Sequence, residues 1–304
     1  MILITGEALV DVVRRPDGTS SAHAGGSPAN VAVGLGRLGL PVQLAATLAD
    51  DEHGHLIRRH LASAGVELLD TLATPDRTAS AVATLDGSGA ASYDFDITWA
   101  PGRIVPTEPP QIVHTGSIAS VLEPGADDVE DLVRRQAPTA VVTFDPNIRP
   151  SLVPDPARAR QRVATLVQLA DVVKVSDEDL AWLEPDLQVD DVAQRWLAAG
   201  PAAVVVTLGP QGSRTYTASG SLAVPTAAEN VVDTVGAGDA FMSGLIGALV
   251  QEDLTGPSGS AELRAADLAL WQRVSTVAAR SAGIVVGRAG SQPPWREELF
   301  GPDD

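Results

Sequence analysis

Short apolar runs alternate with longer stretches of helical spacing along most of the chain, and this alternation constrains the fold more than any other feature. The apolar runs predict buried strands at residues 2–5, 42–47, 112–115, 140–144, 172–175 and 203–208. The stretches between them predict helices at residues 52–64, 125–136, 156–169 and 189–199, with a last long helix at 261–282. This alternation is typical of an α/β fold that has a mostly parallel sheet and helices on both faces.

Ligands of such sheets bind beyond the carboxyl ends of the strands. Six polar residues lie at or near the predicted ends and are expected to gather there: Asp11, His114, Asp145, Lys174, Thr207 and Asp239. Residues 66–100 depart from the alternation, because they read as shorter pieces such as 79–84 and 91–97. These pieces predict a small antiparallel sheet laid on the main body, and residues 213–224 predict a hairpin.

One glycine-rich turn leads directly into an apolar helix, in the stretch Asp233-Thr234-Val235-Gly236-Ala237-Gly238-Asp239-Ala240-Phe241. The glycines let successive N–H groups point into one concavity, and the positive end of the helix dipole favours an anion there. A carboxylate at the mouth of such a site would repel a phosphate, so the presence of Asp239 there needs a chemical explanation. The explanation that fits is that Asp239 takes a proton from an acceptor hydroxyl while the amides stabilise the phosphoryl group. The alternative is an Asp that caps an ordinary helix.

A second glycine-rich stretch, Gly25-Gly26-Ser27-Pro28-Ala29-Asn30, precedes another apolar helix. Ser27 suits the N-cap of that helix and Pro28 its first position. Residues 34–39 match the pattern G-x-G-x-x-G, but they fall within the helix and at its end, not between a strand and a helix. We therefore reject a dinucleotide site at these residues.

Composition limits the partners. The formal net charge of −18 argues against nucleic acid, and no apolar run approaches membrane-spanning length, so we expect a cytoplasmic protein. An anionic ligand would then need local amides, an arginine or a metal. Lys174 is the only lysine beside twenty arginines. A codon bias towards arginine explains the scarcity of lysine, whereas contact with nucleotide phosphates would explain why Lys174 is kept.

The two glycine-rich motifs, at this separation, resemble the signatures of the ribokinase (pfkB) family of ATP-dependent sugar kinases. The resemblance covers nearly the whole chain, including residues 206–212 and 290–293. It implies a ribokinase-like three-layer sandwich with a mostly parallel sheet and a small β lid. The expected organisation is a single sugar-kinase domain, 1–304, with lid segments at about 11–24 and 66–100. The implied ligands are a small sugar and ATP, with a homodimer through the lid as a further expectation.

The same resemblance assigns roles to individual residues. It implies Asp239 as the catalytic base, with an anion hole at Gly236, Ala237 and Gly238. It implies a sugar site at Asp11, Gly26 and Asn30, to which we add Tyr93 and Arg149 as candidates. It implies an ATP site at Thr207, Gly209 and Gly212, to which we add Lys174 and Ser176 as candidates. For Asn30 the alternative is a helix-start residue that bonds the backbone. Tyr93, Phe95 and Trp99 are expected either to place ring faces on the sugar or to form the core of the lid.

Two cations follow from the resemblance, Mg²⁺ with ATP and a K⁺ ion. The residues implied for potassium are Asp233, Val235, Val285, Arg288 and Gly290. For magnesium the sequence departs from the family, because many members have Asn-x-x-Glu where this chain has Ser176-Asp177-Glu178-Asp179. Asp179 keeps the carboxylate on a shorter arm, and its contact to a magnesium-bound water is the expectation.

Within the family, the stretch Phe144-Asp145-Pro146-Asn147-Ile148-Arg149-Pro150 resembles fructokinases. The same Asp-x-Asn-x-Arg pattern occurs in 2-keto-3-deoxygluconate kinases, where an arginine could meet the substrate carboxylate. Arg149 could equally form an ion pair at the surface or on the phosphate side. The expected activity is therefore transfer of the ATP γ-phosphate to a primary hydroxyl of a free sugar, with fructose as the leading acceptor. The alternatives are 2-keto-3-deoxygluconate kinase, nucleoside kinase and a non-catalytic sugar-binding regulator.

Overall fold

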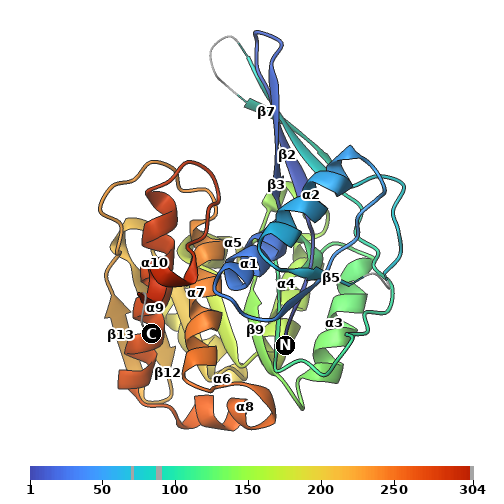
Figure 1. Cartoon of the computed structure of the whole chain (residues 1–304). Coiled ribbons are helices and arrows are strands. Elements are labelled where there is room, and N and C mark those ends of the chain that lie inside the picture. Colours follow the sequence, from blue (N-terminus) through green and yellow to red (C-terminus); the bar gives the residue numbers. More distant parts are fainter. Residues whose placement is uncertain (70–71, 87–90, 302–304) are drawn as a thin grey trace.

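The computed structural model describes residues 1–69, 72–86 and 91–301 of the chain and contains one large sheet and one small sheet (Figure 1). The large sheet has nine strands in the order β13-β12-β11-β10-β9-β8-β1-β4-β5. Its strands are β1 (Ile2–Thr5), β4 (Val42–Ala45), β5 (Glu67–Leu68), β8 (Ile112–Gly116), β9 (Val141–Asp145), β10 (Val172–Ser176), β11 (Ala203–Thr207), β12 (Ser213–Thr217) and β13 (Gly220–Val224). The pairs from β5 to β11 are parallel, and the predicted hairpin β12–β13 adds two antiparallel strands at one edge.

Helices cover both faces of the large sheet, as the alternation predicts. One face carries α1 (Ser27–Arg37), α2 (Glu52–Ser63), α7 (Ala237–Gln251), α8 (Gly256–Ala265) and α9 (Leu268–Val286). The other face carries α3 (Gly125–Gln136), α4 (Pro156–Leu169), α5 (Asp177–Leu183) and α6 (Val189–Ala199). A short last helix, α10 (Arg296–Phe300), packs on α9. Among the described residues, none of these helices is both long enough and apolar enough to span a membrane.

Each strand of the large sheet contributes side chains to two hydrophobic cores, one on each face, because neighbouring side chains of a strand point to opposite faces. In β1, Ile2 and Ile4 join the core beneath α1 and α7, while Leu3 joins the core beneath α3 and α4. In β11, Val205 lies in the first core and Val204 and Val206 in the second. Strands buried on both faces read as continuous apolar runs, which is why the sequence reveals them. The predicted three-layer α/β fold is confirmed.

The small sheet has the order β3-β2-β6-β7 and projects from one end of the large sheet (Figure 1). Its strands are β2 (Leu9–Arg14), β3 (Ser20–Gly25), β6 (Ser80–Leu85) and β7 (Ala91–Asp96). The predicted antiparallel arrangement holds for β2–β3 and β6–β7, but β2 and β6 are parallel. The reason is that the two hairpins come from distant chain segments and are joined side by side at their first strands.

Two of the predicted helix boundaries are wrong. The long helix expected at 261–282 is two helices, because Ala266 adopts an extended conformation and Asp267 caps α9 by accepting from the Leu270 N–H at 2.8 Å. Ser27 is the first residue of α1, and the N-cap is Gly26 with a φ of 97°. A Cβ at Gly26 would lie 2.6 Å from the backbone oxygen of Glu7, so only glycine fits where the chain passes from the small sheet into α1.

Candidate active site

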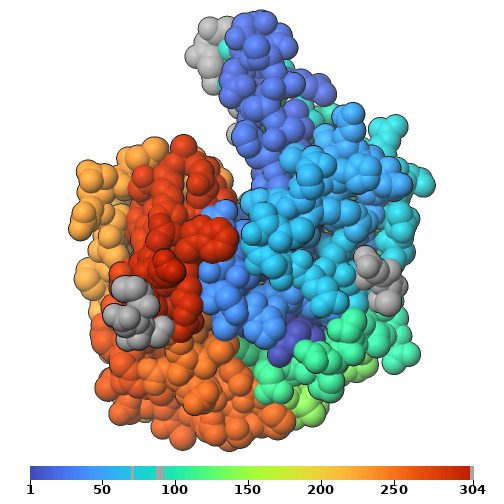
Figure 2. All heavy atoms as spheres, in the orientation of Figure 1, coloured from blue at the N-terminus to red at the C-terminus, as the bar shows by residue number. Residues whose placement is uncertain are grey.

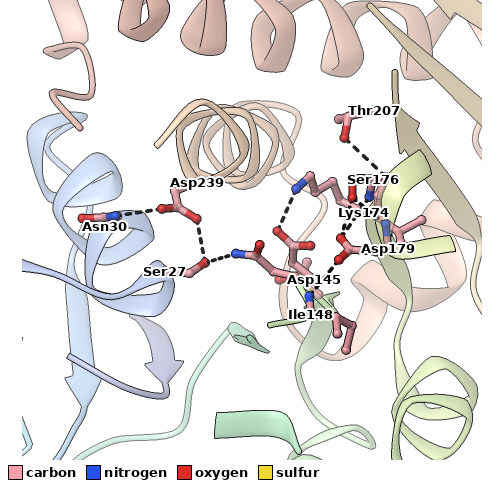
Figure 3. A network of polar contacts seen from close by, with 12 residues as sticks. Ser27, Asn30, Asp145, Ile148, Lys174, Ser176, Asp179, Thr207 and Asp239 are labelled. Carbon is pink, nitrogen blue, oxygen red and sulfur yellow. Dashed lines mark hydrogen bonds and ion pairs between the residues drawn. The ribbon is translucent and has the colours of Figure 1, made fainter. Parts of the chain in front are cut away.

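The carboxyl ends of β9, β10 and β11 face the first turn of α7, and the polar residues of these elements form several neighbouring groups of hydrogen bonds and ion pairs (Figure 3). In the space-filling view, a groove separates the small sheet from the C-terminal part of the main body (Figure 2).

The α7 turn has the shape that an anion site requires. Gly236 adopts a left-handed conformation with φ 78° and ψ 3°, and α7 begins at Ala237. Within the described part of the chain, no side chain caps this helix. The first N–H groups of a helix lack intrahelical acceptors, and here they are backed by the positive end of the α7 dipole. The Ala237 N–H donates to the Thr234 carbonyl at 3.2 Å, and the N–H groups that remain in the turn can bind a phosphate oxygen.

Asp239 is the third residue of α7 and does not cap the helix. Its side chain is turned towards α1, where the Ser27 hydroxyl donates to Oδ1 at 2.6 Å and the Asn30 amide donates to Oδ2 at 2.8 Å (Figure 3). Burial raises the pKa of Asp239, while these two hydrogen bonds and the charges of Lys174 and Arg149 oppose the rise. The interpretations of Asp239 as a helix cap and of Asn30 as a backbone-bonding residue are both wrong.

Lys174 lies beneath the α7 turn. Its Nζ is 2.9 Å from Oδ2 of Asp145, and the two residues are only 3% and 1% exposed. A Cβ at Gly238 would lie 3.0 Å from the same Nζ, so the ammonium group touches the anion site from behind. Burial would lower the pKa of Lys174, but the carboxylates of Asp145, Asp179 and Asp239 outweigh burial and raise it. Lys174 is therefore a buried cation beside the first turn of α7.

The loop after β9 connects this pair to α1. Asn147 has a φ of 39°, an unusual value for a residue with a side chain, and its amide nitrogen donates to the Ser27 hydroxyl at 2.8 Å. Its side-chain oxygen accepts from Nη1 of Arg149 at 2.7 Å. The same Arg149 nitrogen also donates to the carbonyl oxygens of Asn147 and Ile148. Arg149 is exposed, and it holds the loop in shape from the outside.

Sequence reasoning missed the functional contacts of Ser27 and Asn147. The sequence predicts Ser27 as the helix cap, and it places Asn147 only within the fructokinase-like motif. The available signal was that each stands inside a glycine- or proline-containing stretch next to a proposed site residue. The pairing itself joins residues 120 positions apart and depends on the tertiary fold.

The residues proposed for ATP lie at the ends of β10 and β11. Ser176 caps α5, and it forms a capping box with Asp179, whose Oδ2 accepts from the Ser176 hydroxyl at 2.7 Å. Oδ1 of Asp179 accepts from the Ile148 N–H at 2.8 Å, which ties α5 to the loop after β9. Thr207 ends β11 and bonds the Val175 carbonyl at 3.4 Å.

The turn after β11 also matches the sequence expectation. It contains Gly209 and Gly212, and the Leu208 N–H donates to the Gly212 carbonyl at 2.8 Å. The turn leaves the sheet at the same edge as Ser176 and Thr207, which pair in the β10–β11 register. A nucleotide role for these residues stays a prediction.

Among the residues expected to bind sugar, Asp11 lies in β2 of the small sheet and is exposed. A Cβ at Gly25 would lie 2.3 Å from the Asp11 carboxylate, so that carboxylate rests on the glycine pair that leads into α1. Asp11 therefore lies beside Gly25, the residue before Gly26. Its contact with a sugar stays a prediction.

The three aromatic residues expected at the sugar or in the lid lie in different parts of the structure. Tyr93 belongs to β7, but its side chain lies outside the part of the chain that the structure describes. Phe95 is on the same strand and is 36% exposed. Trp99 is 2% exposed in the core of the main body, where it packs against Gly125 at the start of α3. The expectation that Trp99 faces the sugar or fills the lid is wrong, since the chain has already left the small sheet at this residue.

The residues assigned to potassium lie on the loop before α7 and on the end of α9 with the loop that follows it, where Val285 is the second-last residue of the helix. The carboxylate of Asp233 accepts from the Val235 N–H at 3.0 Å and from the Gly290 N–H at 2.9 Å, and these bonds lower its pKa. The Val232 N–H donates to the Val286 carbonyl at 2.7 Å. Arg288 turns its side chain to Glu298 of α10. In the described ranges, no three His, Asp or Glu side chains converge as a metal centre.

Two further titratable residues are buried near the strand ends. His114 is inside β8, 1% exposed, with Nδ1 3.0 Å from the Thr143 hydroxyl, and burial together with the nearby charge of Lys174 lowers its pKa to about 3. A role for His114 in the site stays a prediction. Glu7 follows β1 and is 3% exposed; it accepts from the Ala119 N–H at 3.1 Å, and burial raises its pKa to about 7.

Comparison with known proteins adds independent information. The sequence model of the pfkB family carbohydrate kinases matches residues 1–298. A fructokinase of Rhizobium leguminosarum bv. trifolii is 34% identical over 265 residues, which cover 84% of this chain and 81% of the relative. The structure of a fructokinase from Xylella fastidiosa with bound ATP superimposes with a TM-score of 0.83, at 29% identity, over 98% of this chain and 96% of that one. The structure of a fructokinase double mutant from Vibrio cholerae O395, in a form bound to fructose, ADP and potassium ion, superimposes with a TM-score of 0.78, at 25% identity, over 95% of this chain and 93% of that one.

Proposed function

The chain belongs to the pfkB family of carbohydrate kinases, which are ATP-dependent sugar phosphotransferases, and we propose that its acceptor is fructose, phosphorylated on a primary hydroxyl. One observation carries the catalytic part of the proposal. The carboxylate of Asp239 is held by Ser27 and Asn30 in the first turn of an uncapped helix, and the buried ammonium of Lys174 lies against the same turn. A base, a set of backbone donors and a cation therefore stand together.

In the proposed reaction, Asp239 accepts the proton of the sugar hydroxyl as that oxygen attacks the γ-phosphorus of ATP. The new O–P bond forms while the bond from the γ-phosphorus to the β–γ bridging oxygen breaks, and ADP leaves with the electron pair. Negative charge on the transferring group is stabilised by the amides of Gly236, Ala237 and Gly238, and Lys174 adds a fixed positive charge. In a site with little water, such preorganised donors lower the barrier more than they would in solution.

ATP is proposed to lie along the ends of β10 and β11, at Lys174, Ser176, Thr207 and the turn of Gly209 and Gly212. Magnesium suits the acidic side of this site. Oδ1 of Asp145 is buried without a partner among the described residues, and Asp179 supplies a second carboxylate nearby. Mg²⁺ keeps several waters and is held by one or two carboxylates together with the substrate phosphates. When bound, it would neutralise charge on the β- and γ-phosphates.

Potassium is proposed between the loop that contains Asp233 and Val235 and the segment from Val285, at the end of α9, to Arg288 and Gly290. The two segments are held together through the Asp233 carboxylate, so an ion bound there would stiffen the anion site. Support comes from the Vibrio relative, which was solved with a potassium ion. Activity in potassium salts should exceed activity in sodium salts at equal ionic strength.

For the sugar, we propose contacts from Asp11, Gly26, Asn30, Tyr93 and Arg149. The lean towards fructose rests on the fructokinases among the similar proteins and on the Asp145–Arg149 motif. The second candidate is 2-keto-3-deoxygluconate, because Arg149 is exposed and uses only Nη1 for the loop contacts described above. The other N–H groups of this guanidinium could donate hydrogen bonds to a substrate carboxylate.

We also propose that residues 1–304 form a single sugar-kinase domain in which the small sheet, with segments at about 11–24 and 66–100, acts as a lid. Its outer strands β3 and β7 are sheet edges. Unpaired strand edges can associate with a second copy, which supports a homodimer through the lid. Sedimentation velocity on the full chain, with and without sugar, tests the dimer.

The test of the proposed function is ADP formation from ATP across an acceptor panel of fructose, ribose, 2-keto-3-deoxygluconate, fructose 6-phosphate and adenosine. Fructose should give the highest kcat/KM. A higher kcat/KM for 2-keto-3-deoxygluconate or adenosine would reject fructose as the acceptor, but it would leave the proposed phosphotransfer chemistry unchanged. Product analysis by NMR identifies the phosphorylated hydroxyl.

A further inference from the structure

The oxygen atoms of Asp239 are supported by a chain of side chains that extends well beyond the base itself. The Ser27 hydroxyl donates its only proton to Oδ1 of Asp239 at 2.6 Å, and its oxygen accepts from the Asn147 amide at 2.8 Å. The Asn147 side-chain oxygen in turn accepts from Nη1 of Arg149 at 2.7 Å. All donors point in one direction, from Arg149 towards the base.

We propose that Ser27 and Asn147 are positioning residues that form a relay, in which Asn147 fixes the Ser27 hydroxyl so that its proton is always directed at Asp239. The inference rests on the proposed role of Asp239 as the base. A hydroxyl can rotate and can donate to any acceptor, but the Asn147 amide occupies a lone pair of the Ser27 oxygen and removes that freedom. The orientation of Ser27 is then set from the loop after β9, a different element from the one that carries Ser27.

The relay is built at a cost, which argues against an incidental contact. Asn147 holds a positive φ of 39°, a conformation that side chains seldom adopt. Ser27 is 9% exposed, and as the first residue of α1 it directs its hydroxyl to Asp239. The strained backbone of Asn147 and the buried hydroxyl of Ser27 meet in the same arrangement around Oδ1 of Asp239.

The relay favours the ionised form of Asp239. Burial raises the pKa of this carboxyl, and the hydrogen bond from Ser27 is the leading effect that opposes the rise, followed by Asn30, Lys174 and Arg149. The charged groups that face Asp239 are Lys174 of β10 and, around the end of β9, Arg149 and Asp145. A base must be ionised to accept a proton, so activity should rise with pH through the pKa of Asp239.

Removal of the Ser27 hydroxyl should therefore move the acidic limb of the kcat profile to higher pH. For Ser27→Ala we expect a shift of about one pH unit, the size expected for loss of one charge-assisted hydrogen bond. The matched control is Ser243→Ala, because Ser243 is also buried where α1 and α7 meet but donates to the Ala240 carbonyl at 3.0 Å. The control should leave the limb where it is.

Asn147→Gly tests the relay as a unit, because glycine accepts the positive φ and only the amide is lost. It should shift the limb in the same direction by less, and the double variant with Ser27→Ala should shift no further than Ser27→Ala alone. A folded Ser27→Ala protein whose limb is unmoved, or that loses kcat equally at all pH values, would overturn the proposal. Additive shifts in the double variant would overturn the role of Asn147 through Ser27.

A readout without turnover separates this inference from the proposed function. The side-chain carboxyl carbon of Asp239 can be titrated by ¹³C NMR and assigned by its loss in Asp239→Asn. An upward shift of its pKa in Ser27→Ala supports the relay, and an unchanged pKa overturns it. Failure of every acceptor in the panel would reject the proposed function and leave this titration to decide the relay.

Discussion

Lys174→Met should leave Asp145 as a buried carboxylate without its counter-charge. Methionine fills a volume similar to the lysine stem, so the change removes mainly the ammonium that lies 2.9 Å from Oδ2 of Asp145. At 1% exposure, Asp145 cannot turn to water for compensation. Its other oxygen already has no partner among the described residues. The protein must then either keep an unpaired buried charge or bind a proton.

The expected loss of unfolding free energy is about 3–5 kcal/mol near neutral pH, the usual result when one partner of a buried pair is removed. The loss should depend on pH. Burial raises the pKa of Asp145 to about 6 even though Lys174 lowers it, and without the lysine the pKa must rise further. A carboxyl with a raised folded-state pKa binds a proton that the unfolded chain releases, so stability falls as pH rises between the two values. Between about pH 7.5 and about pH 5.5 the variant should regain about 3 kcal/mol, at roughly 1.4 kcal/mol per unit, and the wild type less.

Urea unfolding followed by circular dichroism at these two pH values measures the effect. The double variant Lys174→Met/Asp145→Asn removes both charges and should recover much of the stability, because a neutral replacement of a buried pair is often tolerated. The control is Arg273→Met, which removes the exposed pair with Glu252 and should leave the unfolding midpoint almost unchanged. In kinetics, Lys174→Met should raise the apparent KM for ATP and leave that for fructose nearly constant. An unaltered midpoint at both pH values would refute the reasoning.

Three further predictions concern single side chains. Asp239→Asn keeps size but cannot accept the proton, so kcat should fall by about 10²–10⁴-fold while ATP affinity, measured by calorimetry, changes little; near-normal turnover would reject the base. Arg149→Ala should weaken use of 2-keto-3-deoxygluconate much more than use of fructose, since a charge-assisted bond is about twice as strong as a neutral one, and equal losses in kcat/KM would remove a carboxylate role. Glu7→Gln should flatten the pH dependence of stability: burial raises the pKa of Glu7 to about 7 from 4.5, so the wild type loses stability as pH rises through that window, by up to about 3 kcal/mol. Thermal unfolding at the two ends of the window checks this, and parallel curves for both proteins would contradict it.

The parts of the fold that the sequence predicts well are those where local signals agree with packing. Helix α4 begins at the predicted residue because Asp155 caps it and Pro156 occupies its first position. The break between α8 and α9 was missed because apolar spacing continues through it, and only the Asp267 cap and the extended Ala266 end the first helix. Helix α5 was missed because its seven residues are too few for a helical period to emerge.

The site could be predicted in its residue types but not in its connections. The turn at Gly236 and the position of Asp239 follow from local sequence, since each depends on neighbours in the chain. Contacts between Ser27 and Asn147, or between Lys174 and Gly238, depend on how α1, α7 and the strand ends meet in space. Sequence spacing carries no information on such contacts, so the sequence predicts Ser27 as a helix cap and does not reveal its hydrogen bond to Asp239.

The burial of Lys174 gives the molecule an unusual resistance to one kind of enzyme. An endoproteinase that cleaves only after lysine has a single target bond in the whole chain, between Lys174 and Val175. That bond lies in the middle of β10, between β9 and β11. Local fraying of a loop or a terminus therefore does not expose it to a protease. Two fragments can therefore form only after the centre of the large sheet opens, and their rate of appearance measures that opening directly in the unlabelled, unmutated protein.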